Sequence, residues 1–254
     1  MRTRWRRRDR RQSWFLSSLR RCRSSCPAIA RCRAAVTTAH RYGSDKGLDT
    51  RGHGYARVYH HFFGPLRSEV RSLLEIGLQR PRQHQRATRI TDAPSLRMWR
   101  GYFPDAFLVG FDIREFGAGS IPNCTIIRGD QGSEADLAKA AAASADGYDI
   151  IIDDGSHVSA DQQLSFAALF PSLKPGGFYV IEDLHWQPPD EEQPDVEKTV
   201  TVFKRFAATG LLSGRFFCDP KLTQNIEGIW LFDSLDTNDP VYSADALLVV
   251  RKKL

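Results

Sequence analysis

Hydrophobic residues in this chain gather in short, nearly continuous runs. Five of these runs have the length of a strand and carry an acidic residue at or near their end: 72–77, 107–113, 124–130, 148–154 and 178–183. Such runs, without strict alternation of apolar and polar positions, are typical of strands buried on both faces of a parallel sheet. The pattern therefore predicts five buried strands.

Helical spacing fills the intervals between these runs. It covers residues 95–103, 133–145, 159–173 and about 196–212, and Ser133 is a candidate N-cap with acids in the turn that follows. Strands that alternate with helices predict a doubly wound, mostly parallel α/β sheet. The last two apolar runs, 226–233 and 246–253, have no helix between them. They are expected to pair as an antiparallel hairpin at one edge of the sheet.

Charge divides the chain into two parts. The net charge of the 254 residues is +6, but residues 1–36 contain twelve Arg and one Asp, which leaves −5 on residues 37–254. A mildly acidic body argues against a nucleic-acid partner. No apolar run approaches the roughly 20 residues of a membrane span, so no membrane partner is expected.

The domain organisation follows from this division. Residues 1–36 are rich in Arg and Ser and are predicted to be a disordered basic tail, with a transit peptide or a basic binding arm as alternatives. Residues 37–254 are expected to form one domain, in which 37–70 is an N-terminal cap or lid. The five cysteines show neither a disulfide framework nor zinc spacing, which favours the cytoplasm.

Carboxylates end all five predicted strands. They are Glu75, Asp112, Asp130, the doublet Asp153 and Asp154, and the doublet Glu182 and Asp183. A single acid at a strand end is usually a turn or cap residue. Five strands of one parallel sheet, however, bring their acids to the same edge at about 4.8 Å spacing, where ligands bind in such sheets. This crowding of charge requires a cation or hydroxyl donors.

The first three strands predict a nucleoside site. Glu75 and Gly77 close the first strand, where the backbone turns tightly. Asp112 ends the second strand, the usual position of an acid that binds ribose hydroxyls. Asp130 and Gln131 end the third strand, where an adenine edge is within reach.

The two doublets predict a metal site. Side chains alternate between the faces of a strand, so only one acid of each doublet faces a given ligand. If the two strands are neighbours in register, Asp154 and Asp183 face the same side and offer Mg²⁺ two hard oxygen donors, and Asp153 is left for the cofactor. A lone turn histidine is usually structural, but His157, three residues beyond Asp154, is here a candidate base for a substrate hydroxyl.

These segments resemble a known family. The stretches LLEIG, GFDI, GDQ, DIIIDDGSH, SFAALFPSLKPGG and YVIEDLHW are similar to class I S-adenosylmethionine-dependent methyltransferases, and most of all to the metal-dependent sugar O-methyltransferases of macrolide and tetracenomycin tailoring. The resemblance runs from about residue 42 to the end. It implies a seven-stranded Rossmann-like sheet, S-adenosylmethionine beside Glu75, Gly77, Asp112 and Asp130, Mg²⁺ at Asp154 and Asp183, and His157 as general base.

Three features of the sequence depart from the family pattern or add to it. A third metal carboxylate is expected before the first strand, and the matching position in YHHFF is His60, which would favour Mn²⁺ over Mg²⁺ or would simply pack. The loop after the first strand keeps one glycine where the family has more. Lys46, in the segment YGSDKG of the expected lid, is a candidate cofactor contact.

The resemblance implies an enzyme of natural-product biosynthesis. Its acceptor would be a small molecule, a sugar or a glycoside, and its oligomeric state is left open, a homo-oligomer included. Two alternatives remain: a metal-dependent tailoring hydroxylase on the same scaffold, and a non-catalytic nucleotide-binding relative. A nicotinamide enzyme is disfavoured because G-x-G-x-x-G does not follow the first strand.

Overall fold

The computed structural model describes residues 27–47, 53–78, 89–90, 92–116, 121–232 and 246–254. Its centre is a seven-stranded sheet in the order β5-β3-β1-β6-β7-β9-β8. The strands are β1 (Ser72–Ile76), β3 (Phe107–Asp112), β5 (Cys124–Arg128), β6 (Tyr148–Asp153), β7 (Leu173–Ile181), β8 (Ile226–Phe232) and β9 (Leu247–Lys252). All seven lie within or close to the runs that the sequence predicts.

The direction of the strands also agrees with the prediction. Strands β5, β3, β1, β6 and β7 pair in parallel, whereas β9 is antiparallel to both β7 and β8. The last two strands therefore pair as an antiparallel hairpin, and β9 is inserted between β7 and β8. Chain order reverses at β1, which has β3 on one side and β6 on the other. The carboxyl ends of β1 and β6 are thus the expected place for a ligand.

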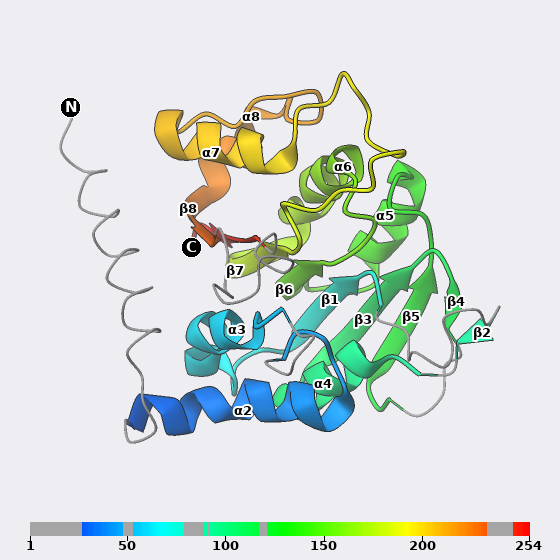
Figure 1. Cartoon of the computed structure of the whole chain (residues 1–254), viewed down its shortest axis with the longest axis vertical. Coiled ribbons are helices and arrows are strands. Elements are labelled where there is room, and N and C mark those ends of the chain that lie inside the picture. The colour runs from blue at the N-terminus through cyan, green and yellow to red at the C-terminus, as the bar shows by residue number, and fades with distance from the viewer. Residues whose placement is uncertain (1–26, 48–52, 79–88, 91, 117–120, 233–245) are drawn as a thin grey trace.

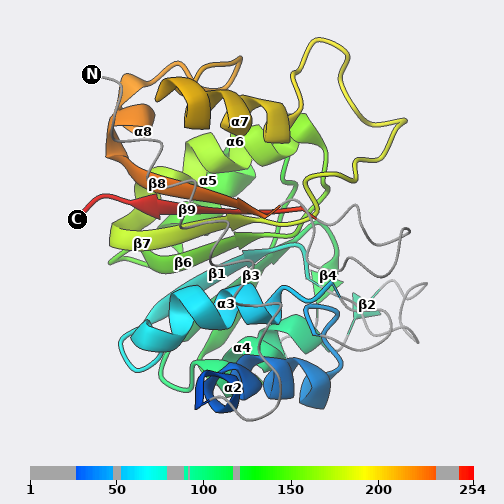
Figure 2. The same cartoon turned by 60° about the vertical axis from the view of Figure 1, so that its left-hand side comes forward.

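Helices cover both faces of the sheet (Figures 1 and 2). One face carries α2 (Pro27–Tyr42), α3 (Ala56–Phe63) and α4 (Pro94–Tyr102), and the other carries α5 (Glu134–Ala142), α6 (Ser159–Leu169) and α7 (Thr199–Thr209). Short elements complete the fold: η1 (Gly64–Leu66), η3 (Phe170–Ser172), α8 (Pro220–Asn225) and a separate two-stranded parallel sheet of β2 (Arg89–Ile90) and β4 (Glu115–Phe116). The small sheet was not predicted.

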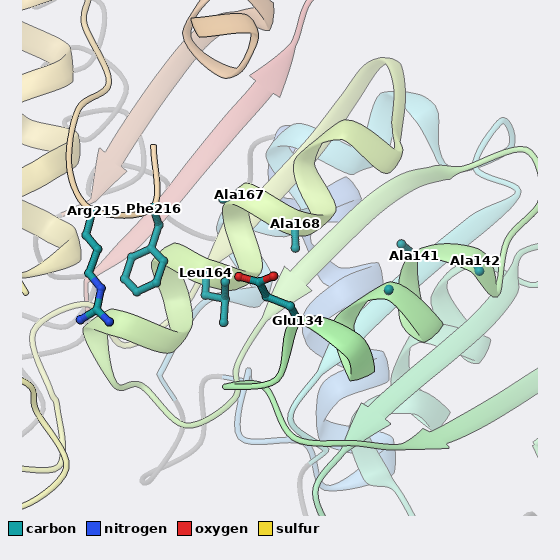
Figure 3. A pocket seen from close by; sticks show the side chains of 9 residues that line it. Glu134, Ala141, Ala142, Leu164, Ala167, Ala168, Arg215 and Phe216 are labelled. Atoms are coloured by element: carbon teal, nitrogen blue, oxygen red, sulfur yellow. The ribbon is translucent and has the colours of Figure 1, made fainter. Parts of the chain in front are cut away.

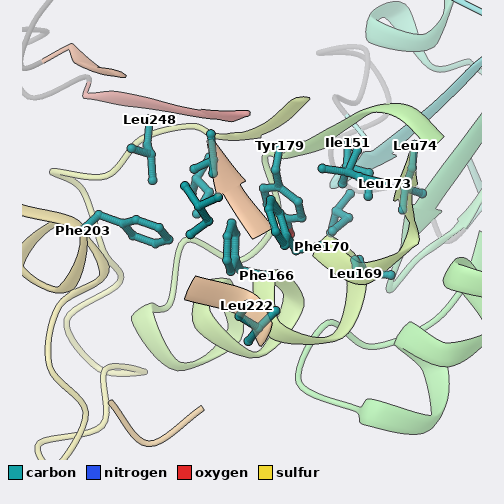
Figure 4. Packing of buried hydrophobic residues seen from close by; sticks show 14 of the residues in the cluster. Leu74, Ile151, Phe166, Leu169, Phe170, Leu173, Tyr179, Phe203, Leu222 and Leu248 are labelled. Atoms are coloured by element: carbon teal, nitrogen blue, oxygen red, sulfur yellow. The ribbon is translucent and has the colours of Figure 1, made fainter. Parts of the chain in front are cut away.

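Alternation along the strands divides the core between the two faces. Leu74 and Ile76 belong to the cluster shared with α5, α6 and α7, whereas Leu73 belongs to the cluster under α2, α3 and α4. Figure 4 shows the first cluster, where Phe166 of α6 stacks on Phe170 and meets Tyr179 of β7 edge-on. The continuous apolar runs are therefore explained by burial on both faces.

Three local expectations can be compared with the structure. Ser133 is an N-cap, because its side chain accepts a hydrogen bond from the Asp136 backbone amide. The helix predicted over 159–173 ends earlier, at Leu169, and β7 begins at Leu173 and runs through the KPGG segment. The predicted tail boundary at residue 36 falls inside α2, whose Ala35 and Ala39 are buried against α3 and α4.

Two predicted features lie outside the described residues, namely the tail at 1–26 and most of the loop after β1, at 79–88. Within the part that is described, no helix has the length and apolar character needed to cross a bilayer.

Candidate active site

One acid from the end of each of β6 and β7, Asp154 and Glu182, faces the α3 side of the sheet. Ile152 pairs with Val180 and Asp153 with Ile181, so one step further along the chain Asp154 lies beside Glu182. Alternation places Asp154 and Glu182 on the same face as Ile152 and Val180, which is the face covered by α2, α3 and α4. By the same rule Asp183 would point to the opposite face.

A left-handed turn brings Asp183 back to Asp154. Asp183 has a φ of 53° and His157 has a φ of 61°, both in the region that non-glycine residues rarely adopt. Asp154, His157 and Asp183 consequently offer ligand atoms that all lie within 4.8 Å of one another. His157 Nε2 is 3.7 Å from Asp183 Oδ2. The two aspartates do lie together, but backbone conformation beyond the strand brings them there, not strand alternation.

Donors from the N-terminal segment engage these acids. The Lys46 ammonium is 2.6 Å from Asp154 Oδ2 and 2.8 Å from Glu182 Oε1. The Tyr55 hydroxyl donates to Asp183 Oδ1, and the Tyr59 hydroxyl donates to Glu182 Oε1. Lys46 is fully buried, so its charge is balanced by these carboxylates and not by water.

Burial and charge shift the titration of this group. Burial alone would lower the pKa of Lys46, but Asp154, Glu182 and Glu75 hold this pKa well above its usual value, so the ammonium stays charged. Burial raises the pKa of Glu182, and the neighbouring Asp154 adds to the effect. Burial also raises the pKa of Glu75 to about 7, against the opposing influence of Lys46. The single ammonium of Lys46 therefore does not keep all of the neighbouring carboxyl groups in their charged form at their usual pKa.

Glu75 and Gly77 lie at the switch point of the sheet. Glu75 is fully buried; its Oε1 accepts a hydrogen bond of 3.1 Å from Trp99 Nε1, whereas its Oε2 has no partner among the described residues. Gly77 has a φ of 76°, and a Cβ there would lie 1.9 Å from the Asp154 carbonyl oxygen. Only glycine permits this approach of β1 to the loop that carries Asp154.

Asp112 and Asp130 lie at the ends of the next two strands. Asp112 accepts hydrogen bonds of 2.8 Å from the backbone amides of Leu78 and Arg114, one on each oxygen. Asp130 is exposed, and its Oδ1 accepts a bond of 2.8 Å from the Gly132 amide. A carboxylate oxygen has more than one acceptor position, so both groups retain capacity for ligand hydroxyls or amines.

Gln131 and Asp153 have internal partners. Gln131 Nε2 donates to Asp153 Oδ1 over 2.8 Å, and Gln131 Oε1 accepts from the Ser156 amide over 2.8 Å. Asp153 is buried on the α6 side of the sheet, which raises its pKa to about 8. These contacts hold the turn that presents His157, and a direct contact of Gln131 or Asp153 with a cofactor stays a prediction.

His60 lies away from the acidic group. Its Nδ1 is 2.6 Å from the Tyr102 hydroxyl of α4. Tyr55 and Tyr59 are four residues apart and share the face of the helical segment that meets the acids, whereas His60 is turned by about 100° from Tyr59. The structure therefore does not bring the predicted third ligand to Asp154 and Asp183.

Sequence reasoning missed the two tyrosines and His53. His53 Nδ1 is 3.8 Å from Asp183 Oδ1, and its ring stacks on Tyr55. The signal for the tyrosines was their spacing of four residues in the segment HGYARVY, which places both on one helical face.

A groove elsewhere on the protein is distinct from this group. It has a volume of about 760 Å³ and lies between α5 and α6, lined largely by alanines together with Leu164, Arg215 and Phe216 (Figure 3). None of the strand-end acids lines it.

Sheet order, an antiparallel β9 and a carboxylate edge at the switch point together define the Rossmann-like methyltransferase fold. A solved structure of the MycE methyltransferase of mycinamycin biosynthesis, in complex with Mg, SAH and mycinamycin VI, has this fold, with a TM-score of 0.67 and 27% identity. The match covers 87% of this chain and 54% of that one.

Comparison of the sequence finds relatives whose names state their reaction. The 8-demethyl-8-alpha-L-rhamnosyl tetracenomycin-C 2'-O-methyltransferase of Streptomyces olivaceus is 34% identical over 203 residues, 73% of this chain and 50% of that protein. The mycinamicin VI 2''-O-methyltransferase of Micromonospora griseorubida is 36% identical over 132 residues, 52% of this chain and 32% of that protein. The resemblance to sugar O-methyltransferases inferred from the sequence is therefore confirmed.

The matches cover only part of each relative's length. The chain spans half or less of the length of the curated relatives it matches. No family model matches the chain.

Proposed function

We propose that this protein is an S-adenosylmethionine-dependent O-methyltransferase, assisted by a divalent cation, that acts on a hydroxyl of a sugar or glycosylated small molecule. The observation that carries the proposal is the convergence of Asp154, His157 and Asp183 at the carboxyl edge of a methyltransferase fold. Relatives that methylate sugar hydroxyls support the same reaction class.

The acidic group fits a divalent cation. Asp154 and Asp183 provide hard oxygen donors within 4.8 Å of each other, and their two carboxyl groups outnumber the one ammonium, that of Lys46, beside them. Such donors suit Mg²⁺ and also accept Mn²⁺. A cation held there would supply positive charge that makes an acceptor hydroxyl more acidic. Because His60 lies elsewhere, we assign the protein's share of the ligands to the two aspartates.

The residues at the switch point of the sheet are suited to bind S-adenosylmethionine. The buried Oε2 of Glu75 has no partner in the described residues, which marks a position for a donor such as an ammonium group. Asp112 is held in place by two backbone amides and keeps acceptor capacity for ribose hydroxyls. We therefore assign S-adenosylmethionine to Glu75, Gly77, Asp112 and Asp130. Lys46, Gln131 and Asp153 have partners that favour a supporting role.

We assign to His157 the role of general base, which accepts the proton of the acceptor hydroxyl. Its Nε2 lies 3.7 Å from Asp183 Oδ2, and its Nδ1 has no partner among the described residues. His157 accepts the proton of the acceptor hydroxyl while that oxygen bonds to the methyl carbon of the sulfonium. The carbon–sulfur bond breaks and its electron pair stays on sulfur, which yields a methyl ether and the thioether product. Alignment of the two reactants and electrostatic stabilisation account for most of the expected rate.

The location of the protein is part of the proposal. Cys124 and Cys218 are free thiols. Free cysteines are typical of a reducing compartment, so we assign the enzyme to the cytoplasm.

The proposal is tested by direct assay. The full chain is incubated with S-adenosylmethionine and a rhamnosyl glycoside, with Mg²⁺, with Mn²⁺ or with EDTA, and the thioether product and the methylated glycoside are measured by mass spectrometry. We expect both products with either cation and neither with EDTA. Cofactor binding without methyl transfer to any glycoside of a panel, at saturating cation, would reject the proposed acceptor class.

A further inference from the structure

One segment of the chain supplies the donors to the strand-end acids. We call residues 44–47 and 53–59 the brace. It provides Lys46 to Asp154, Tyr55 and His53 to Asp183, and Tyr59 to Glu182. These residues belong to the segment that the sequence predicts to be a cap or lid. Their contacts place the brace against the carboxylates.

The contacts of the brace with the Asp183 carboxylate involve one of its two oxygens, Oδ1. Oδ1 accepts the Tyr55 hydrogen bond and lies 3.8 Å from His53 Nδ1, whereas Oδ2 lies on the side of His157 Nε2 at 3.7 Å. Asp183 therefore has one oxygen committed to the protein and the other directed at the position where a cation would be held. The side chain of Asp183 is only 13% exposed. Its orientation therefore depends on the hydrogen bond from Tyr55 and not on water.

Tyr55 is itself rigidly held. Its side chain is fully buried, its ring stacks with His53 at 5.4 Å and meets Tyr59 edge-on at 6.5 Å. The backbone on either side is tied together, since the Ala56 amide donates to the Lys46 carbonyl over 2.8 Å. A donor fixed in this way restricts the rotamers of the carboxylate that it binds.

We propose that Tyr55 is a positioning residue that sets the affinity of the cation site by orienting Asp183, and this rests on the proposed function. A ligand carboxylate that is already oriented does not lose rotamer freedom when the cation binds. Hydrogen-bond partners behind metal ligands typically change metal affinity or activity by about 10–100-fold when they are removed.

Tyr59 provides a matched control. It lies four residues further along, is buried to the same extent, and also donates its hydroxyl to a carboxylate. That carboxylate belongs to Glu182, which is not one of the three residues of the cation cluster and keeps Lys46 as a partner. Tyr55→Phe and Tyr59→Phe thus remove the same atom from the same helical face and differ in the acid that loses it.

The experiment measures Mn²⁺ affinity of the full chain by calorimetry, for the wild type and both variants, together with the thermal midpoint in EDTA. We expect Tyr55→Phe to weaken Mn²⁺ binding by about 10–100-fold and Tyr59→Phe to leave it within about twofold. The activity of Tyr55→Phe should return at high Mn²⁺, with kcat close to the wild type. A purely structural tyrosine would lower the thermal midpoint without this shift in the metal requirement.

The outcomes separate the two proposals. If the wild type binds Mn²⁺ and the two variants bind it equally well, or are weakened equally, the role of Tyr55 is rejected and the proposed function stands. If the wild type binds neither Mn²⁺ nor Mg²⁺, the cation site itself is rejected, and the role of Tyr55 is rejected with it.

Discussion

At the scale of single residues, His157 and Asp183 are two of the three described non-glycine residues with a left-handed backbone; the third, Asn123, precedes β5. Each adopts a left-handed backbone conformation that costs a non-glycine residue about 1–3 kcal/mol. His157 and Asp183 both belong to the group of three that converge at the sheet edge. Strain that coincides with a cluster of this kind is typical of a functional site, because the fold must stabilise it elsewhere.

His157→Ala should remove methyl transfer selectively. Loss of a general base typically lowers the rate by about 10²–10⁴-fold. The thioether product and Mn²⁺ should still bind within a few-fold of the wild type, as measured by calorimetry. His61→Ala is the control, since His61 is exposed and outside the cluster. A loss of Mn²⁺ affinity that parallels the loss of rate would instead make His157 a metal ligand.

Glu75 should give the protein a pH-dependent stability. Its pKa is about 7 in the folded state, against 4.5 for an exposed glutamate. Between these values only the unfolded chain releases the proton, so the stability present below about pH 4.5 is lost as the pH rises towards 7. In urea denaturation with EDTA, the loss of stability between pH 5 and pH 7 should be about 2 kcal/mol smaller for Glu75→Gln than for the wild type, because buried Asp153 and Glu182 contribute their own losses in both proteins. Parallel pH profiles for the two proteins would contradict the assignment.

At the scale of elements, the site depends on how closely β1 approaches the loop after β6. The Gly77 amide donates to the Phe111 carbonyl, and the Asp154 amide donates to the Ile76 carbonyl, which locks three strand ends together. The space left at Gly77 is too small for a side chain. The residues of β1 to which we assign the cofactor and the residue after β6 to which we assign the cation are therefore linked through backbone contact.

Gly77→Ala should damage both halves of the site. The added Cβ would lie 1.9 Å from the Asp154 carbonyl oxygen, so the loop must move. We expect more than 10-fold weaker Mn²⁺ and cofactor binding by calorimetry. Gly210→Ala is the matched control, because Gly210 has a φ of 75° but no atom within 4 Å of the added Cβ. It should cost only the backbone strain, about 1 kcal/mol in denaturation. Equal effects of the two substitutions would refute the coupling.

At the scale of the whole molecule, the sheet brings together segments that are distant in sequence. Lys46 reaches Asp154 across 108 residues and Glu182 across 136 residues. The brace and α3 therefore form part of the acidic edge of the sheet, although they precede the first strand.

The positions of the strands along the chain and the acidic edge could be predicted because apolar runs and turn residues are local signals, whereas the order of the strands in the sheet was not predicted. Each strand buries its run on both faces, so its position in the chain and its terminal acid are visible in the sequence. The antiparallel hairpin was predictable in the same way, from the missing helix between β8 and β9. Ser133 as an N-cap is a third case.

The sequence by itself determined the seven strands of the main sheet, the helices α4 to α7 and the set of acids at the strand ends, but not the small sheet or the helices α2, α3 and α8. Tertiary structure decided which of those acids share a site: Asp183 joins Asp154 through a left-handed turn, and His60 is excluded because it faces α4. The physical reason is that side-chain alternation holds only along a regular strand or helix. Beyond the last residue of an element, φ and long-range hydrogen bonds set the direction of each side chain.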